Sequence, residues 1–557
     1  MRAALLALLV VAGTLAAIPA PAVGSVAGPP SVVPGAGTAD GAGQSLQPAA
    51  RETDPAPPDP ETDVIGWENG VWYNESIPVD QTGLGDKGLT ERETELLTAR
   101  TMARVEVLRQ LEFTQDVTVE YISRETLRER LQGMSFGETT NDQVYEAMFV
   151  FGEDVDANEK LEGFLGDAVI GYAAEEGATN LTIVTRSEDL HAVDEAVLAH
   201  ELVHVLQHQQ FDLRQARYQR ETLDGEWGKD GLIEGEASYI DWRYSQECIS
   251  NWSCTRPPSN WAGASVPSGV RGFSLLASQP YNDGASFVSE AYEAGGWKAI
   301  DALHGDPPVS SEQIIHRDRS LAPVPLEAPD RSTDDWEAYH TNTVGEAGMF
   351  AMFYAHRERV PDGRAVLDRD PFDRQYDWDT LDFDFEPTAG WGNDVFRAYR
   401  DGDRRAFAWT SVWDTERDAR EFAGAYEQAL TGLGAWRYGE HTYIIEEGPF
   451  ADAYSVVREN RTVRIVNAPT VGALEEIDSR ARPEPNPYVD DLRERIDEQN
   501  RTIEALQERL EAQNRTIAEL ESRLGDGTGV GTPWSAGLLV LAVAIVALLL
   551  AGRRARD

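Results

Sequence analysis

The segment 199–205, Ala-His-Glu-Leu-Val-His-Val, constrains the fold of this chain more than any other part of the sequence. His200 and His204 are four residues apart, so on a helix both imidazoles project from one face. Apolar residues flank them at positions 197, 198, 202, 205 and 206. A helix with this pattern is buried, and its polar side chains then need partners inside the protein. We therefore predict a long buried helix from about Val193 to Gln210.

Two histidines at this spacing can bind one Zn²⁺ ion, and Glu201 lies beside them, able to reach water on the metal without being a ligand. A catalytic zinc site needs a third protein ligand. The extended motif with Gly at 207 and His at 210 is excluded, because both positions hold Gln. A second helical stretch begins with Leu-Ile-Glu-Gly-Glu-Ala-Ser-Tyr at 232–239. It offers Glu234 as the third ligand, with Glu236 as the alternative.

The His-Glu-Leu-Val-His and Glu-Gly-Glu-Ala segments, with a predicted strand hairpin before them, resemble the gluzincin metallopeptidases. The resemblance is specific across about 165–240 and looser over 281–316. It implies a zincin-like domain in which Zn²⁺ is held by His200, His204 and Glu234, with Glu201 as the catalytic base. Bound zinc lowers the pKa of its water to about 7, and the glutamate takes the proton as that water attacks the peptide carbonyl.

Further residues are candidates for supporting roles. A donor that stabilises the oxyanion is expected from one of three residues, Tyr239, Tyr281 or His316. Ligand imidazoles could be oriented by one of three others, Asp230, Ser238 or Asp241. His208 continues the face of the two histidines and is expected to support them without binding the metal. The strand 181–185 is expected to present an edge to which an extended peptide adds.

The charge of the chain excludes one class of partner. Its 557 residues hold 96 acidic and 49 basic side chains, a net charge of −47. Such a surface repels phosphate backbones, so nucleic-acid binding is excluded. Folded, acid-rich, lysine-poor chains resemble the proteins of salt-loving archaea, where surface carboxylates hold water and cations.

The two ends of the chain indicate its compartment. Residues 1–22 have the charged, apolar and small-residue order of a secretory signal peptide, and 23–62 is a Pro/Gly/Ala-rich linker. Residues 534–552 are uncharged and long enough to span a bilayer, and the Arg-rich tail 553–557 belongs on the cytoplasmic side. We therefore expect a single-pass protein of the cell membrane with most of its chain outside, an arrangement that resembles haloarchaeal surface proteins.

Cysteines and glycosylation sequons are consistent with that placement. The only cysteines, Cys248 and Cys254, are expected to form a small disulfide loop. The chain also contains six Asn-x-Ser/Thr sequons as glycosylation candidates. They are Asn74, Asn180, Asn251, Asn460, Asn500 and Asn514.

The remaining patterns complete the expected organisation. Apolar residues alternate by three and four over 487–524, which predicts a coiled-coil stalk and self-association into a homo-oligomer; the alternative is a monomeric amphipathic spacer. Mixed strand and helix patterns over 345–482 predict a separate α+β module. The expected fold class is therefore α+β: a zincin-like metallopeptidase domain at 63–344, the module at 345–482, the stalk, and one transmembrane helix.

Two functions of different classes follow. The first is an extracellular, membrane-anchored zinc metallopeptidase that acts on a peptide or protein substrate. The alternative is a non-catalytic surface-layer or adhesion glycoprotein that retains a peptidase-like metal-binding fold.

Overall fold

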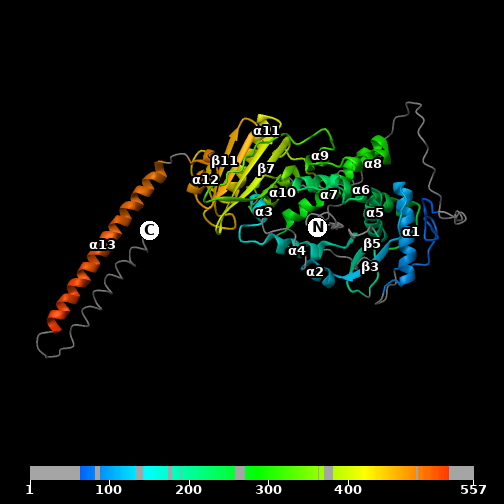
Figure 1. The fold of residues 1–557 in the computed structure, drawn as a ribbon, viewed down its shortest axis with the longest axis horizontal. Coiled ribbons are helices and arrows are strands. Elements are labelled where there is room, and N and C mark those ends of the chain that lie inside the picture. The colour runs from blue at the N-terminus through cyan, green and yellow to red at the C-terminus, as the bar shows by residue number, and fades with distance from the viewer. Residues whose placement is uncertain are drawn as a thin grey trace, which may run out of the picture. The chain divides into compact units, whose positions relative to one another are not determined.

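The structure is a computed structural model, and it divides into two compact units, residues 1–484 and 485–557. It describes the following ranges: 63–81, 88–132, 142–173, 179–188, 190–256, 270–361, 363–368, 381–483 and 487–525. The predicted signal peptide 1–22, linker 23–62, transmembrane helix 534–552 and tail 553–557 lie outside these residues. The first unit contains two larger sheets and most of the helices (Figure 1).

A three-stranded sheet lies beside the metal-motif helix. Its order is β3 (Thr118–Ser123), β5 (Asn180–Thr185) and β4 (Gly171–Ala173). The pair β4–β5 is antiparallel, which confirms the predicted hairpin, and β3 is parallel to β5. The prediction that 181–185 forms an edge is wrong, because β5 pairs on both sides; in the described sheet the edge on that side is β4.

The central helices are α1 (Glu91–Arg109), α5 (Glu195–Phe211), α6 (Leu223–Ser250) and α7 (Arg271–Gly295). Helix α5, which corresponds to the predicted helix, begins where the Asp194 side chain accepts a hydrogen bond from the Ala196 amide. The backbones of α6 and α7 approach closely at Gly235 and Gly284, where a Cβ atom would collide with the facing backbone. Gly235 therefore lets the residues beside it, including Glu234, pack deep in the protein.

The second large sheet is antiparallel with seven strands, in the order β6-β7-β8-β12-β11-β10-β9. Helix α11 (Glu416–Gly432) covers one face and α12 (Val471–Ile477) covers the other (Figure 1). The strands are β6 (Glu337–Asn342), β7 (Trp391–Asp401), β8 (Arg404–Trp413), β9 (Trp436–Arg437), β10 (Thr442–Ile444), β11 (Ala453–Glu459) and β12 (Thr462–Ala468).

Shorter elements complete the first unit. The short strands are β1 (Trp67–Glu68) and β2 (Val71–Trp72). The other helices are α2 (Arg124–Gln132), α3 (Asp142–Ala147), α4 (Ala157–Ala168), η2 (Ala216–Tyr218), α8 (Trp297–Gly305), α9 (Ser311–Ile315), α10 (Gly345–Arg357) and η3 (Ser479–Ala481).

The two predicted parts of the globular chain share one hydrophobic core. Helix α10, which begins where the module at 345–482 was expected to begin, is buried against α6 and α7. One apolar cluster extends from Ile122 on β3 through Phe350 on α10 to Ile465 on β12. Apolar faces from both parts are thus removed from water by each other, which stabilises them as one body.

The expected fold class is wrong. The first unit is a mixed α/β body, and in place of a coiled-coil stalk the second shows one helix, α13 (Pro487–Gly525). The apolar side chains along α13 are 39–59% exposed, namely Ile496, Ile503, Leu506, Leu510 and Ile517. A heptad pattern buries its seam only when a second helix is present, and the described residues supply none. Among them, no helix combines the length and apolar character needed to span a bilayer.

Candidate metal centre

Two helices bring the three predicted ligands together. His200 and His204 project from α5, and Glu234 projects from α6. Glu234 Oε2 lies 3.1 Å from His204 Nε2 and 3.5 Å from His200 Nε2, and the two Nε2 atoms are 3.3 Å apart. All three side chains are less than 5% exposed. Within the described residues, this is the one group of three or more potential ligands close enough to hold an ion.

The donor set and its spacing fit a tetrahedral metal ion. Zinc bonds of about 2.0–2.1 Å to nitrogen and oxygen require ligand atoms about 3.3 Å apart, near the separations observed here. Glu234 Oε2 is buried and faces the Nε2 atoms of both ligand histidines. Two neutral imidazoles and a carboxylate are ligands that zinc accepts. His200, His204 and Glu234 are therefore the residues that would hold it.

The electrostatics of the group favour a positive charge at its centre. Burial by itself raises the pKa of Glu234, but His204 and hydrogen bonds from both histidines lower it to about 2. Burial lowers the pKa of His204, yet the Glu234 charge raises it to about 9. The carboxylate thus retains its charge and requires a proton on a histidine, or a cation, beside it. Metal binding would displace that proton.

Glu201 is buried beside this group without a hydrogen-bond partner. Neither of its carboxylate oxygens has a partner among the described residues, and the side chain is fully buried. Burial raises its pKa to about 8, against the lowering effect of His204. Gly171 on β4 makes room for it, because a Cβ atom at that position would lie 2.5 Å from Glu201 Oε1. Nothing in the sequence pattern singled out Gly171; only the close approach of β4 to α5 identifies it.

Gln207 positions one of the ligands. His204 Nδ1 lies 3.0 Å from Gln207 Oε1, so the imidazole can donate through Nδ1 and leave Nε2 for a metal. Gln207 Nε2 donates in turn to Glu236 Oε2 at 2.8 Å and to the Ile233 carbonyl at 3.0 Å. From the sequence, Gln207 served only to exclude a histidine-rich motif. Its place three residues after His204, on the same helical face, was the available signal.

Glu236, the alternative ligand, lies outside the metal group. It forms buried ion pairs with Arg109 and with His304, whose Nε2 atom is 2.7 Å away. These partners, rather than the two metal-site histidines, satisfy its charge. The result follows from the two-residue offset, which points Glu234 and Glu236 to different sides of α6.

Of the three predicted oxyanion donors, the structure brings only Tyr281 to the group. Its ring stacks on His200 with centroids 6.0 Å apart, and its hydroxyl donates a hydrogen bond to Glu234. Tyr239 instead packs in an aromatic cluster with Trp297 and neighbouring rings. His316 pairs with Glu346 at 2.9 Å.

The residues that were expected to support the metal ligands lie on α5 and α6 and differ in their contacts. Asp230, one turn before Glu234, interacts electrostatically with it and pairs with Lys229 at 3.1 Å. His208 is buried one turn after His204, and burial lowers its pKa to about 4. Ser238 and Asp241 lie further along α6. Burial and the charge of Asp194 together raise the pKa of Asp241 to about 7.

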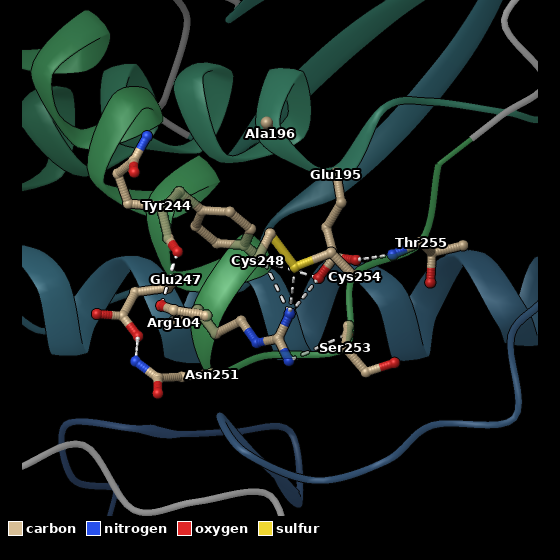
Figure 2. Close-up of a disulfide and its surroundings, with 12 residues drawn as sticks. Arg104, Glu195, Ala196, Tyr244, Glu247, Cys248, Asn251, Ser253, Cys254 and Thr255 are labelled. Atoms are coloured by element: carbon tan, nitrogen blue, oxygen red, sulfur yellow. Dashed lines mark hydrogen bonds and ion pairs between the residues drawn. A yellow bond between two sulfur atoms is a disulfide. The ribbon is translucent and has the colours of Figure 1, made fainter. Parts of the chain in front are cut away.

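The structure joins Cys248 and Cys254 by a disulfide at the C-terminal end of α6 (Figure 2). Five of the six sequon asparagines are exposed, whereas Asn74 is only 4% exposed and is a poor acceptor for a glycan. The exposed ones are Asn180, Asn251, Asn460, Asn500 and Asn514.

Comparison with known proteins gives one match, and it lies away from the metal group. A family model described as a domain of unknown function (DUF8575) matches residues 334–478, from just before β6 to just after α12. No curated protein and no solved structure matches the chain. The similarity therefore covers the seven-stranded sheet and its helices, and the case for a function depends on the chemistry of the site.

Proposed function

We propose that this chain is a zinc-dependent hydrolase of peptide bonds, with His200, His204 and Glu234 as ligands and Glu201 as general base. One observation carries the proposal: Glu201 is fully buried beside the ligand group, and both its oxygens lack partners in the described structure. A buried carboxyl group without a hydrogen bond is costly, so its retention beside a metal-type cluster calls for a chemical role. The gluzincin resemblance supports the same assignment.

Zinc, when bound, supplies a water of lowered pKa and polarises a carbonyl. Glu201 accepts the proton on a carboxylate oxygen and passes it to the departing amine. Gln207 holds the His204 ring through Nδ1, so that Nε2 faces the ligand group. Tyr281 contacts both a ligand histidine and the ligand glutamate, so its hydroxyl is the donor best placed to meet a developing oxyanion.

The disulfide and the exposed sequons support a location outside the cell. Disulfides persist in oxidising compartments, and glycans attach to exposed asparagines of secreted chains. The substrate would then be an extracellular peptide or protein.

A second function is favoured by the depth of the site. The three ligands and Glu201 are each less than 5% exposed, as in a structural metal site that stabilises a fold without turning over substrate. On that reading the chain is a non-catalytic surface glycoprotein with a bound metal.

The discriminating experiment measures metal content and casein hydrolysis in molar salt. The wild type should bind about one zinc ion per chain. Glu201→Gln should keep the zinc and lower hydrolysis by about 10²–10⁴-fold, since general-base catalysis contributes that much. Glu234→Gln should lose zinc as well as hydrolysis. The matched control, Glu221→Gln, changes an exposed glutamate just before α6 and should leave both unchanged.

The alternatives predict different results. Stoichiometric zinc in wild type and Glu201→Gln alike, with no hydrolysis by either, would support the structural metal site. A folded wild-type protein that binds no zinc would contradict both functions.

A further inference from the structure

The seven-stranded sheet contains a hollow lined by arginines on the face that α12 covers. The hollow is small and partly open: the space in which a water-sized group can be centred is about 20 Å³. Its charged lining consists of four arginines and two acidic residues, a net charge of +2 in a chain whose total is −47. The arginines are Arg331, Arg397, Arg464 and Arg480, and the acids are Glu327 and Asp478.

Strand register explains why a hollow forms here. Thr410 on β8 stands between Val395 on β7 and Arg464 on β12, and Ala408 pairs with Arg397 in the next row of the same face. The small side chains of Ala408 and Thr410 leave space above the sheet that the long neighbouring arginines surround. At one end of the hollow, the larger side chain of Tyr399 lines it and also belongs to the apolar cluster beneath α12.

The charge of the hollow is only partly neutralised by the protein. Arg331 and Arg480 share Asp478, at 3.2 and 3.5 Å. Arg464 pairs with Glu459, which lies outside the lining, at 2.7 Å.

Arg397 differs from the other three arginines. It donates to two neutral oxygens, Thr341 Oγ1 at 3.0 Å and the Ala328 carbonyl at 3.2 Å. No carboxylate lies within ion-pair distance of it in the part of the chain that the structure describes, and Asp330 acts on it only through a longer electrostatic interaction. The two bonds hold the guanidinium in place and use two of its five N–H donors. A half-buried, fixed guanidinium with spare donors is suited to an anion.

We propose that this hollow is a binding site for the oxyanion group of a small ligand, a phosphate, sulfate or carboxylate. Planar guanidinium groups bind such oxyanions through paired hydrogen bonds, which a lysine-lined site could not match in geometry. The acidic remainder of the surface disfavours anions elsewhere, so the hollow is a local exception. The site belongs to the sheet and its neighbouring segments, away from the metal ligands, and is independent of the hydrolase proposal.

The test titrates the full chain with inorganic phosphate at constant high ionic strength and follows binding by calorimetry and by the unfolding midpoint. Sulfate and acetate, titrated separately, distinguish the oxyanion chemistries. Phosphate or another of these anions should bind saturably and raise the midpoint, because a ligand of the native state stabilises it. Arg397→Gln should weaken binding at least tenfold, and Arg397→Lys should weaken it less.

Arg400→Gln is the matched control, since Arg400 lies on the opposite face of β7 and pairs with exposed Glu337. It should bind the anion like the wild type. If Arg397→Gln is poorly folded, Arg480→Gln replaces it, because Arg480 is more exposed and already shares its acid. Equal affinities of wild type, Arg397→Gln and Arg480→Gln, or no saturable binding of any of the three anions, would overturn the proposal.

Discussion

Helix α5 contains two buried glutamates that differ in their hydrogen-bond and ion-pair partners. Glu195, at its first turn, has four partners: Arg100 at 2.9 Å, Arg104, the Tyr244 hydroxyl and the Thr255 amide, the last three each at 2.7 Å. Figure 2 shows how Arg104, Tyr244 and Thr255 converge on this carboxylate beside the disulfide. Glu201, six residues later and just as buried, has no hydrogen-bond partner among the described residues.

The contrast distinguishes a buried carboxylate that stabilises the fold from a buried carboxyl group that does not. A buried carboxylate that is surrounded by hydrogen-bond donors stabilises the folded state, and it holds together the segments that supply those donors. A bare carboxylate in the same helix lowers stability, so a protein that retains one gains something other than stability. The first turn of α5 therefore anchors the helix, and the middle of α5 is the part to which we assign the proposed chemistry.

A third buried glutamate shows another solution. Glu68 on β1 shares a hydrogen bond with Glu106 on α1, and burial together with that neighbour raises the pKa of Glu68 to about 10. Glu106 also accepts hydrogen bonds from the amides of Gly66 and Phe113, each at 2.9 Å. Here a retained proton, rather than an arginine, neutralises one of two buried carboxyl groups.

The largest effect is expected from Glu195→Ala. The substitution leaves two buried guanidiniums, Arg100 and Arg104, without their carboxylate, which should lower the free energy of unfolding by about 3–5 kcal/mol. Denaturant unfolding at constant salt measures this, with Glu221→Ala as an exposed control. A loss below about 1 kcal/mol would contradict the contrast between Glu195 and Glu201, because Glu195 would then contribute little to stability.

Opening the disulfide should have the next largest effect. The bond closes a loop across six positions, for which chain entropy predicts a stabilisation of about 2 kcal/mol. The loop also presents the Ser253 carbonyl to Arg104 at 3.4 Å, so part of the anchor loosens with it. Unfolding of the Cys248→Ser/Cys254→Ser double variant, compared with reduced wild type, measures the change. No shift in either sample would show that the anchor does not need the loop.

A smaller effect, graded with pH, is expected at Glu68. Because its pKa is raised in the folded state, the stabilisation is complete below the ordinary pKa of a glutamate and is lost as pH rises toward about 10. Wild-type stability should therefore fall on raising the pH from 7 to 8, by up to about 1.4 kcal/mol from this group. Glu68→Gln should flatten that slope, and equal slopes in urea titrations of both proteins would contradict the shared proton.

The smallest effect on stability is expected from Glu201→Gln. Replacing a partnerless buried carboxyl group by a neutral amide should change the free energy of unfolding by less than about 1 kcal/mol at neutral pH, or raise it slightly. The same variant should lose hydrolysis in the experiment proposed above. A destabilisation as large as that of Glu195→Ala would contradict the distinction between the first turn of α5 and its middle.

Local structure could be predicted where capping residues or helical spacing lie within one short segment. The start of α1 is encoded within four residues, because the Thr90 and Glu93 side chains form a reciprocal cap there. Helix α11 is capped in the same way by Thr415 and Asp418. The spacing of His200 and His204 is also local, because it depends only on helical periodicity.

The predictions that were wrong, and the site residues that were not recognised, depended on contacts between distant segments. The edge role of 181–185 was wrong because β3, some sixty residues earlier, pairs with β5. The fold class was wrong because the first unit is a mixed α/β body and because the described residues place no second helix along the apolar seam of α13. Gly171 and Gln207 were not recognised as site residues, since each matters only through a neighbour brought close by folding.

By itself, the sequence determined the residue types of the candidate site, their helical spacing and the acidic character of the surface, because these depend on composition and on a local period. Only the tertiary structure decided that Glu234 rather than Glu236 meets the histidines, that Glu201 has no hydrogen-bond partner among the described residues, and that four arginines surround one hollow. The physical reason is that packing brings together side chains far apart in the chain, and burial then amplifies every charge that it leaves unmatched.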